Sequence, residues 1–292
     1  MANWTRRNAL GTLSCLGGLG LGLGGGLLGC RERHDPNGEH EVAAALPLPI
    51  ATIKGRYAAR WTKEGAGATV RRIFPGPSMR NLDPFVLLDD FDVRRPAGFP
   101  MHPHRGFEAF TYMVEGAFFH RDNLGNESRI EAGGTQRFTS GSGAWHSEMP
   151  ASNGRNRGLQ LWVNLPRRLK KMPPDYEGIA AKEMPTGSDG GVLTSEVVGP
   201  GSPVILQSDV GYRVFTFPNS GGCELVIPTA HQGLVYVLEG EAKVLGAVAR
   251  AGDVLIPGSG RVPVEARPGT RLALLHGRPH GEGIVHRGPF VD

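Results

Sequence analysis

The sequence is poor in cysteine: it has three, and two of them, Cys15 and Cys30, lie close to its start. The rest of the chain therefore holds a single thiol, Cys223, which cannot form a disulfide within that part of the protein. A single thiol also rules out a cysteine-rich metal motif. We expect Cys223 to be a small core residue.

The chain also lacks sustained helical periodicity and concentrated charge. No stretch keeps an apolar helical repeat over three turns. The 32 Lys and Arg residues against 28 Asp and Glu give a formal net charge of only +4, and the arginines are scattered. This distribution argues against nucleic acid as a partner.

Glycine and proline are abundant instead, with 44 and 23 residues among 292. Short apolar runs lie between turn-forming residues, as at 85–88, 110–114 and 159–163, which is typical of β-strands. The stretch 122–126 predicts the turn of a hairpin. These patterns indicate an all-β protein that is long enough for one large or two medium domains.

A weak internal repeat favours two similar halves. The stretch 111–116 (TYMVEG) resembles 235–240 (VYVLEG), and 132–134 (AGG) resembles 251–253 (AGD). Two copies of one β unit are the simplest explanation. Residues 166–190, rich in Pro, Lys and Gly, are predicted to connect the two copies.

Residues 1–30 resemble an export signal. The pair Arg6-Arg7 precedes a mildly apolar Gly/Leu run, as in twin-arginine signals. The run ends in Leu-Leu-Gly-Cys at Cys30, which resembles a bacterial lipobox, whose cysteine is lipidated. A cleaved signal without lipid, a membrane anchor and a cytoplasmic tail are the alternatives. We expect export to the periplasm or cell envelope, a lipid anchor on Cys30 and a flexible tether over 31–50.

Two short motifs share one spacing: His102-x-His104 and His146-x-Glu148. Side chains alternate between the faces of a β-strand, so the two members of each pair point the same way. If the strands are neighbours, the four side chains converge on one space. Three imidazoles and a carboxylate form a mononuclear transition-metal site, for which Fe(II) is a natural occupant and Mn, Ni, Cu and Zn are also suitable.

The second copy lacks these pairs. His231 precedes its VYVLEG stretch without a His-x-His motif, and the later segment 257–263 contains no histidine. We therefore expect no metal in the second half, and we expect His231 to be a surface or hydrogen-bonded histidine.

The chain resembles the pirin family of the cupin superfamily at several motifs, which together span about residues 52–292. The motifs are 81–85 (NLDPF), 98–100 (GFP), 102–108 (HPHRGFE), 116–122 (GAFFHRD), 146–150 (HSEMP), 158–166 (GLQLWVNLP) and 288–291 (GPFV). Of these, HPHRGFE and HSEMP are the specific ones.

The resemblance implies an all-β fold of two antiparallel β-barrel (jelly-roll) cupin domains, packed face to face in a monomer. We place the first domain at 51–170, a linker at 171–190 and the second domain at 191–292. Iron, the usual metal of the family, would bind in the first domain alone, through the three histidines and Glu148.

The family also implies an activity. Bacterial members include quercetin 2,3-dioxygenases, and an animal member is an iron-dependent transcriptional co-regulator. Four protein ligands leave one or two open positions on a five- or six-coordinate ion. We therefore predict a dioxygenase that cleaves quercetin-type flavonols or related phenolics with dioxygen. The alternatives are a non-catalytic metal-binding protein that senses iron or redox state or binds a partner, and a cupin whose metal is only structural.

Glu148 and Glu108 are the candidate catalytic carboxylates, either of which could accept the substrate proton. We expect Glu108 to lie just outside the ligand set and to orient a ligand histidine; the alternative is a solvated or salt-bridged carboxylate. Trp145, next to His146, could reshape or cover the pocket. The segment 120–122 is expected to be a hairpin end.

Overall fold

A computed structural model describes residues 48–292 of the protein. The predicted export signal, with its lipidated cysteine, and most of the predicted tether lie outside this range. The last tether residues, 48–50, run beside β21 (Gly260–Ala266), where the Arg261 amide donates to the Pro49 carbonyl at 2.8 Å. Within the described range, no helix has the length and apolar character needed to span a membrane.

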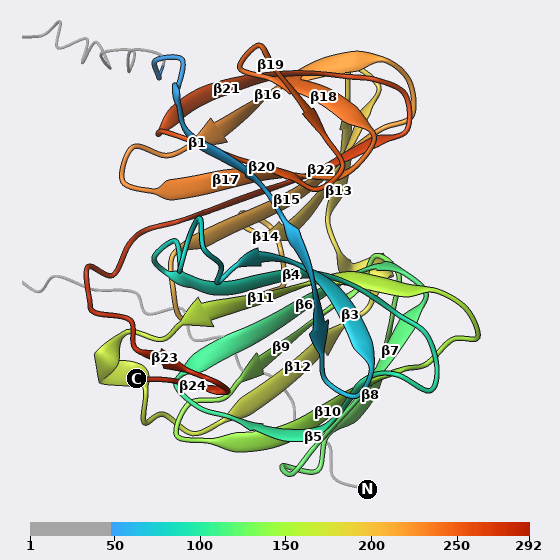
Figure 1. Ribbon diagram of the computed structural model, residues 1–292, viewed down its shortest axis with the longest axis vertical. Helices are drawn as coiled ribbons and strands as arrows, with labels where there is room; N and C mark the ends of the chain where they lie inside the picture. The colour runs from blue at the N-terminus through green and yellow to red at the C-terminus, as the bar shows by residue number, and fades with distance from the viewer. Residues whose placement is uncertain (1–47) are drawn as a thin grey trace, which may run out of the picture. The chain divides into compact units, whose positions relative to one another are not determined.

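The described chain is built from layers of antiparallel β-sheet (Figure 1). Its only helices are two short 3-10 turns, η1 (Arg167–Leu169) and η2 (Ala181–Glu183). The predicted all-β class is therefore confirmed. No sheet in the described range closes into the barrel that we expected, and each half consists of two separate sheets.

The first half pairs a seven-stranded sheet with a four-stranded one. In spatial order the larger sheet contains β12 (Asp175–Ile179), β9 (Thr135–Thr139), β6 (Phe107–Glu115), β11 (Asn156–Asn164), β4 (Phe85–Val93), β3 (Ala68–Phe74) and β2 (Arg60–Glu64). The smaller contains β5 (Phe99–His104), β10 (Ala144–Pro150), β7 (Ala117–Asp122) and β8 (Glu127–Glu131). Phe91 of the larger sheet stacks on Phe118 of the smaller at 4.6 Å between ring centroids, so aromatic side chains join the two layers.

The second half repeats this arrangement. Its larger sheet contains β1 (Ile53–Ala58), β20 (Asp253–Pro257), β17 (Gln232–Glu239), β22 (Thr270–Gly277), β15 (Val210–Phe217), β14 (Val192–Val198) and β13 (Thr186–Asp189). Its smaller sheet contains β16 (Gly221–Ile227), β21, β18 (Glu241–Val244) and β19 (Ala247–Arg250), and a separate ribbon joins β23 (His286–Arg287) to β24 (Phe290–Val291).

The internal repeat occupies equivalent places in the two halves. β6 and β17 carry the repeated sequences, and each lies inside a large sheet, between two neighbouring strands. Both strands are followed by a glycine with positive φ, 72° at Gly116 and 76° at Gly240. A residue with a Cβ is strained in that conformation, so the shared glycines are required by the shared turn.

The two large sheets pack on each other. Leu161 of the first and Tyr212 and Tyr236 of the second belong to one buried apolar cluster. A charged network crosses the same interface: Arg157 Nη2 lies 2.9 Å from Asp90 Oδ2, and the Tyr236 hydroxyl donates to that oxygen at 2.8 Å. The interface is therefore both apolar and specifically hydrogen-bonded.

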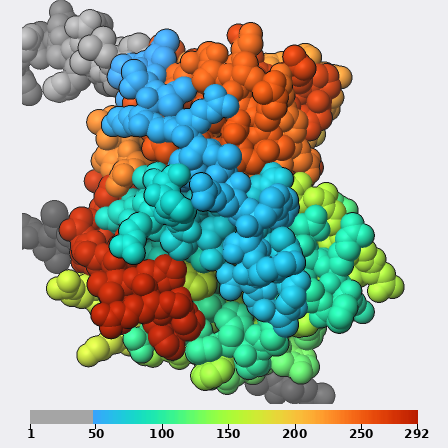
Figure 2. Space-filling view, viewed as in Figure 1, coloured from blue at the N-terminus to red at the C-terminus, as the bar shows by residue number. Residues whose placement is uncertain are grey.

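Each end of the described chain packs against the half that is farther from it in the sequence. β1 precedes the first half in sequence but pairs with β20 of the second. The β23–β24 ribbon follows the second half but lies against the first, where the Val291 amide donates to the Arg105 carbonyl at 3.0 Å; Figure 2 shows these last residues in red over the first half. β12 and β13 extend the first and second large sheets. The sheets thus depart from the bounds 51–170, 171–190 and 191–292 that we predicted.

Candidate metal centre

β5 and β10 place the two predicted ligand motifs side by side. The strands pair antiparallel, with His146 opposite His102. Side chains alternate along β10 as predicted, because His146 and Glu148 are buried whereas Trp145 is 49% exposed. The i, i+2 spacing therefore brings the motif side chains to the interior of the first half.

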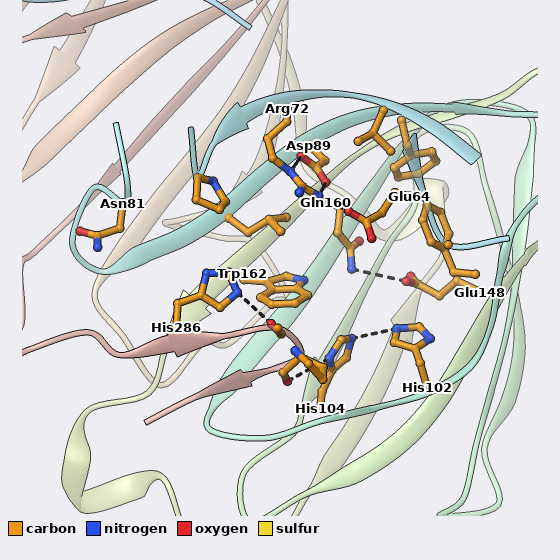
Figure 3. Close-up of a pocket in the computed structure, with 18 of the residues that line it drawn as sticks. Glu64, Arg72, Asn81, Asp89, His102, His104, Glu148, Gln160, Trp162 and His286 are labelled. Carbon is orange, nitrogen blue, oxygen red and sulfur yellow. Dashed lines mark hydrogen bonds and ion pairs between the residues drawn. The ribbon is translucent and has the colours of Figure 1, made fainter. Parts of the chain in front are cut away.

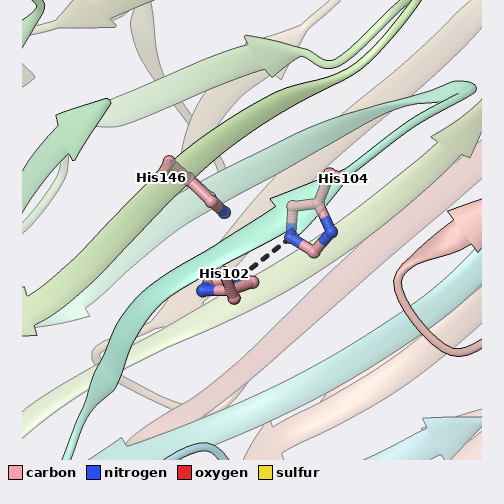
Figure 4. Close-up of side chains that lie close together, drawn as sticks. All are labelled: His102, His104 and His146. Carbon is pink, nitrogen blue, oxygen red and sulfur yellow. Dashed lines mark hydrogen bonds between the residues drawn. The ribbon is translucent and has the colours of Figure 1, made fainter. Parts of the chain in front are cut away.

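Three imidazoles converge at this point (Figure 4). One ring nitrogen from each of His102, His104 and His146 lies within 4.8 Å of the others, a spacing that could hold a metal ion. The Nε2 atoms of His102 and His104 are 3.0 Å apart. His146 completes the group, with its ring centroid 4.6 Å from that of His102 and 4.8 Å from that of His104.

The hydrogen bonds around the histidines fit a bound cation. Nδ1 of His102 donates to the Pro100 carbonyl at 2.7 Å, and Nδ1 of His104 to the Pro289 carbonyl at 3.4 Å. In the neutral rings, both Nε2 atoms then present lone pairs to each other. Both nitrogens of His146 are buried, and neither has a hydrogen-bond partner among residues 48–292. A cation between the rings would relieve the repulsion and satisfy a buried nitrogen, and imidazole is a common ligand of transition metals.

Burial keeps these rings neutral. Desolvation lowers the pKa of His102, lowers that of His104 to about 3, and lowers that of His146 well below its usual value. Neutral imidazole is the form that binds a metal, so the site needs no deprotonation at neutral pH.

Glu148 lies outside the group of three imidazoles. The register of β10 against β5 shifts between His146 and Glu148. The Glu148 carboxylate accepts hydrogen bonds from Thr111 Oγ1 at 2.9 Å, from Gln136 Nε2 and from Gln160 Nε2 at 3.4 Å. Burial raises the pKa of Glu148 to about 7. The structure therefore groups three of the four predicted ligands and places the fourth in a neighbouring network of polar side chains.

Glu108 has a different role from the one we predicted. Its carboxylate accepts hydrogen bonds from Thr139 Oγ1 at 2.9 Å and from the Gln207 backbone amide at 2.8 Å. Each of its oxygens therefore meets a donor that is not a ligand histidine, and Gln207 belongs to the second half. Burial raises the pKa of Glu108. Glu108 links the two halves instead of orienting a histidine.

Trp145 does not cover the pocket, because it lies on the opposite face of β10 from His146. Its amide donates to Asn123 Oδ1 at 2.8 Å. The indole beside the histidines is Trp162 of β11, whose ring centroid lies 4.8 Å from that of His104 in an edge-to-face arrangement. The prediction that Trp145 shapes the pocket is therefore wrong, and the tryptophan in the pocket lining is Trp162.

A further histidine lies behind the three. His120 is fully buried, with its ring centroid 5.3 Å from that of His146, and it stacks on Tyr176 at 3.8 Å. Its Nε2 lies 3.0 Å from Asp122 Oδ2, which also accepts from the Asn126 side chain. The hairpin end at 120–122 is confirmed, but sequence reasoning missed the inward-facing imidazole. The available signal was the spacing of His120 and Asp122, which matches that of the ligand motifs.

A pocket of about 800 Å³ lies beside the histidines (Figure 3). His102, His104 and Glu148 contribute polar groups to it. Its apolar lining includes Leu87, Phe91, Phe99, Phe118 and Trp162. Pockets of this size that combine apolar walls with a few convergent polar groups are typical binding sites for small molecules.

The second half fills the corresponding space with aliphatic side chains. β16 and β21 pair there as β5 and β10 do in the first half, with Leu225 opposite Val262, and both belong to a buried apolar cluster. Cys223 packs at the edge of the same cluster. His231 is hydrogen-bonded as predicted, with its Nδ1 2.8 Å from that of His276.

The fold and the site together define an all-β, cupin-like protein with two similar halves and a group of three histidines in the first. The chain belongs to the pirin family. Residues 67–163 match the Pirin family, and residues 212–292 match the Pirin C-terminal cupin domain. A pirin-like protein of Solanum lycopersicum is 40% identical over 264 residues, covering 86% of this chain and 89% of that protein.

Solved structures show the same architecture. A quercetin 2,3-dioxygenase from Acinetobacter baumannii superimposes with a TM-score of 0.77 at 29% identity, covering 83% of this chain and 92% of that one. A bacterial pirin from Escherichia coli, in complex with nickel(II), superimposes with a TM-score of 0.65 at 20% identity, covering 77% of this chain and all of that one.

Proposed function

We propose that the protein is a metal-dependent dioxygenase that cleaves quercetin-type flavonols or related phenolics. The observation that carries this proposal is the convergence of three neutral imidazoles beside a large, partly apolar pocket. Two of them, those of His102 and His104, line this pocket together with the buried carboxylate of Glu148. The similarity to a quercetin 2,3-dioxygenase supports it.

The three histidines would hold the metal, with Glu148 as the fourth ligand that we predicted. Iron(II) is our first choice, and the nickel(II) complex of the Escherichia coli pirin is consistent with alternatives. A bound metal would supply Lewis acidity toward a phenolic oxygen and a place for dioxygen to react with the electron-rich ring.

The pocket suits a flat aromatic substrate. Phe91 and Phe118 stack on each other, and Trp162 stacks on Phe107 at 4.1 Å between ring centroids, so the apolar walls are held rigidly. Aromatic walls bind a planar ring by burial and by ring–ring contact. The substrate would enter between them with its hydroxyl toward His102 and His104.

Glu148 would accept the proton of the substrate hydroxyl. It is a buried carboxylate in the lining of the pocket, and a positioned carboxylate can act as a general base. Thr111 and Gln136 donate hydrogen bonds to one of its oxygens and so fix the orientation of the carboxylate. Within the described part of the chain, the other oxygen receives a single long hydrogen bond, from Gln160, and we assign the proton transfer to it.

The test is metal analysis of the purified protein together with a turnover assay. Iron-loaded protein, quercetin and dioxygen should give oxygen uptake and carbon monoxide above the spontaneous rate, and His146→Ala should abolish both. A chain that binds the metal but gives no turnover with flavonols or simpler phenolics would contradict the dioxygenase and favour the non-catalytic alternative.

We also propose export with a lipid anchor on Cys30, on the basis of the twin-arginine and lipobox patterns alone. In a bacterial host the chain should incorporate radiolabelled fatty acid, and Cys30→Ala should lose the label. Replacement of Arg6-Arg7 by lysines should leave the chain in the cytoplasm. Unlabelled wild-type protein in the cytoplasm would contradict both proposals.

A further inference from the structure

Residues 284–291, here called the strap, cross from the second half to the metal centre in the first. The strap contains the β23–β24 ribbon. Just before the strap, the backbone amides of His280 and Gly281 donate to the carboxylate of Asp83, a residue of the first half, at 3.1 and 2.9 Å. This contact holds the segment that leads into the strap against the first half.

The far end of the strap is held more firmly. The Val291 side chain is fully buried in an apolar cluster with Phe107 and Trp162. Its amide donates to the Arg105 carbonyl at 3.0 Å, and its carbonyl accepts from Lys170 Nζ at 3.0 Å. The strap is therefore anchored at both ends, with its middle over the pocket.

The middle of the strap meets the metal centre directly. Ile284, Val285, His286, Gly288 and Pro289 line the pocket. The Pro289 carbonyl accepts the hydrogen bond from His104 Nδ1 at 3.4 Å. A bond at Nδ1 keeps the proton there and leaves Nε2 free to bind a metal.

His102 and His104 differ in where this support comes from. The Nδ1 partner of His102 is the carbonyl of Pro100, two residues away on the same strand. The partner of His104 comes from a segment that follows the whole second half of the chain. The orientation of one ligand histidine thus depends on a segment that is not a strand of either sheet of the first half.

We infer that the strap is a positioning element of the metal centre, which holds His104 in its metal-binding orientation through the Pro289 carbonyl and thereby controls metal retention. This inference rests on the metal site of the proposed function but requires no turnover. Loss of an outer hydrogen-bond partner of a metal-ligating histidine typically weakens metal affinity by about 10- to 100-fold.

The test measures release of Ni²⁺ to a chromogenic chelator from the full chain and its variants. Val291→Asp puts a carboxylate into the apolar cluster, so the strap end must leave, and release should accelerate by about 10-fold or more. Val248→Asp is the matched control, because it makes the same exchange on the half-exposed strand β19 of the second half. The control should release Ni²⁺ within about twofold of the wild-type rate, since no ligand partner is lost.

Lys170→Met is a milder variant in case Val291→Asp does not fold. It removes the ammonium that donates to the Val291 carbonyl, and Ni²⁺ release should accelerate in the same direction. Folded variants that retain Ni²⁺ as the wild type does would overturn the inference while leaving the dioxygenase proposal intact. Wild-type protein that retains Ni²⁺ but turns over no phenolic would contradict only the dioxygenase, and wild-type protein that binds no metal would overturn both.

Discussion

The rings of His104 and Trp162 lie edge-to-face, with 4.8 Å between the ring centroids. Trp162 also lines the pocket, so this one indole contacts both a candidate ligand and the space for substrate. Among the aromatic side chains of the pocket, Trp162 is therefore the one whose removal should weaken ligand binding most.

Trp162→Leu should weaken binding of a phenolic ligand to the metal-loaded protein by about fivefold to tenfold, the amount expected from a lost aromatic contact. Trp145→Leu should leave that affinity unchanged, because its indole lies on the outer face of β10. Anaerobic titration followed by absorbance would measure both. Equal effects of the two substitutions would contradict the position assigned to Trp145.

His146→Ala should lower the affinity for Fe²⁺ or Ni²⁺ by at least about 100-fold, because the metal would keep only two imidazoles. His231→Ala is the control, since His231 is a hydrogen-bonded histidine of the second half. Isothermal titration of the metal-free proteins would compare them. Loss of metal affinity in His231→Ala but not in His146→Ala would contradict the placement of the metal centre in the first half.

The pKa of Glu148 predicts how the stability of the metal-free protein varies with pH. The folded pKa of about 7 lies above the ordinary value of 4.5, so the unfolded chain gives up this proton first as pH rises. The contribution of Glu148 is therefore most favourable below about pH 4.5 and is lost as pH rises to about 7, a change of about 3 kcal/mol.

Glu148→Gln should remove this dependence. Denaturant unfolding of both proteins between pH 5 and pH 8 would measure it, with the wild type losing stability relative to the variant as pH rises. A difference between the two proteins that stays constant over this range would contradict the raised pKa.

Arg157→Met should lower the free energy of unfolding by about 3–5 kcal/mol, because it leaves the Asp90 carboxylate buried without its cationic partner. Arg155→Met is the matched control: Arg155 pairs with Asp92 at 2.8 Å, but both side chains are partly exposed, so the cost should be at most about 1 kcal/mol. Similar losses of unfolding free energy in both variants would contradict a larger contribution from the buried Arg157–Asp90 pair than from the partly exposed Arg155–Asp92 pair.

Local patterns in the sequence predicted the features that depend on local geometry. Strand alternation gave the shared direction of His102 and His104, and the repeated glycine turns marked the two halves. The same alternation places Trp145 on the face of β10 opposite His146. The prediction that Trp145 covers the pocket was therefore inconsistent with the alternation that predicted the ligand pairs.

Other features depend on contacts that no local pattern contains. The shifted register between His146 and Glu148 arises from pairing with β5, and it accompanies the separation of the carboxylate from the imidazoles. The bond from Glu108 to Gln207 and the bond from His104 to Pro289 join residues far apart in the chain. Such contacts follow from the packing of the halves, which the sequence of either half alone does not specify.

The exchange of chain ends between the halves means that the repeat is not a set of interchangeable modules. A fragment cut in the connection between the halves would carry β1 without its partner β20 and would lack the wall of the pocket that residues 284–291 supply. The complementary fragment would present an unpaired sheet edge at β20, of the kind that invites association with other chains. The crossed ends therefore make the two similar halves one structural unit, because each half would lose a strand or a pocket wall if the other were removed.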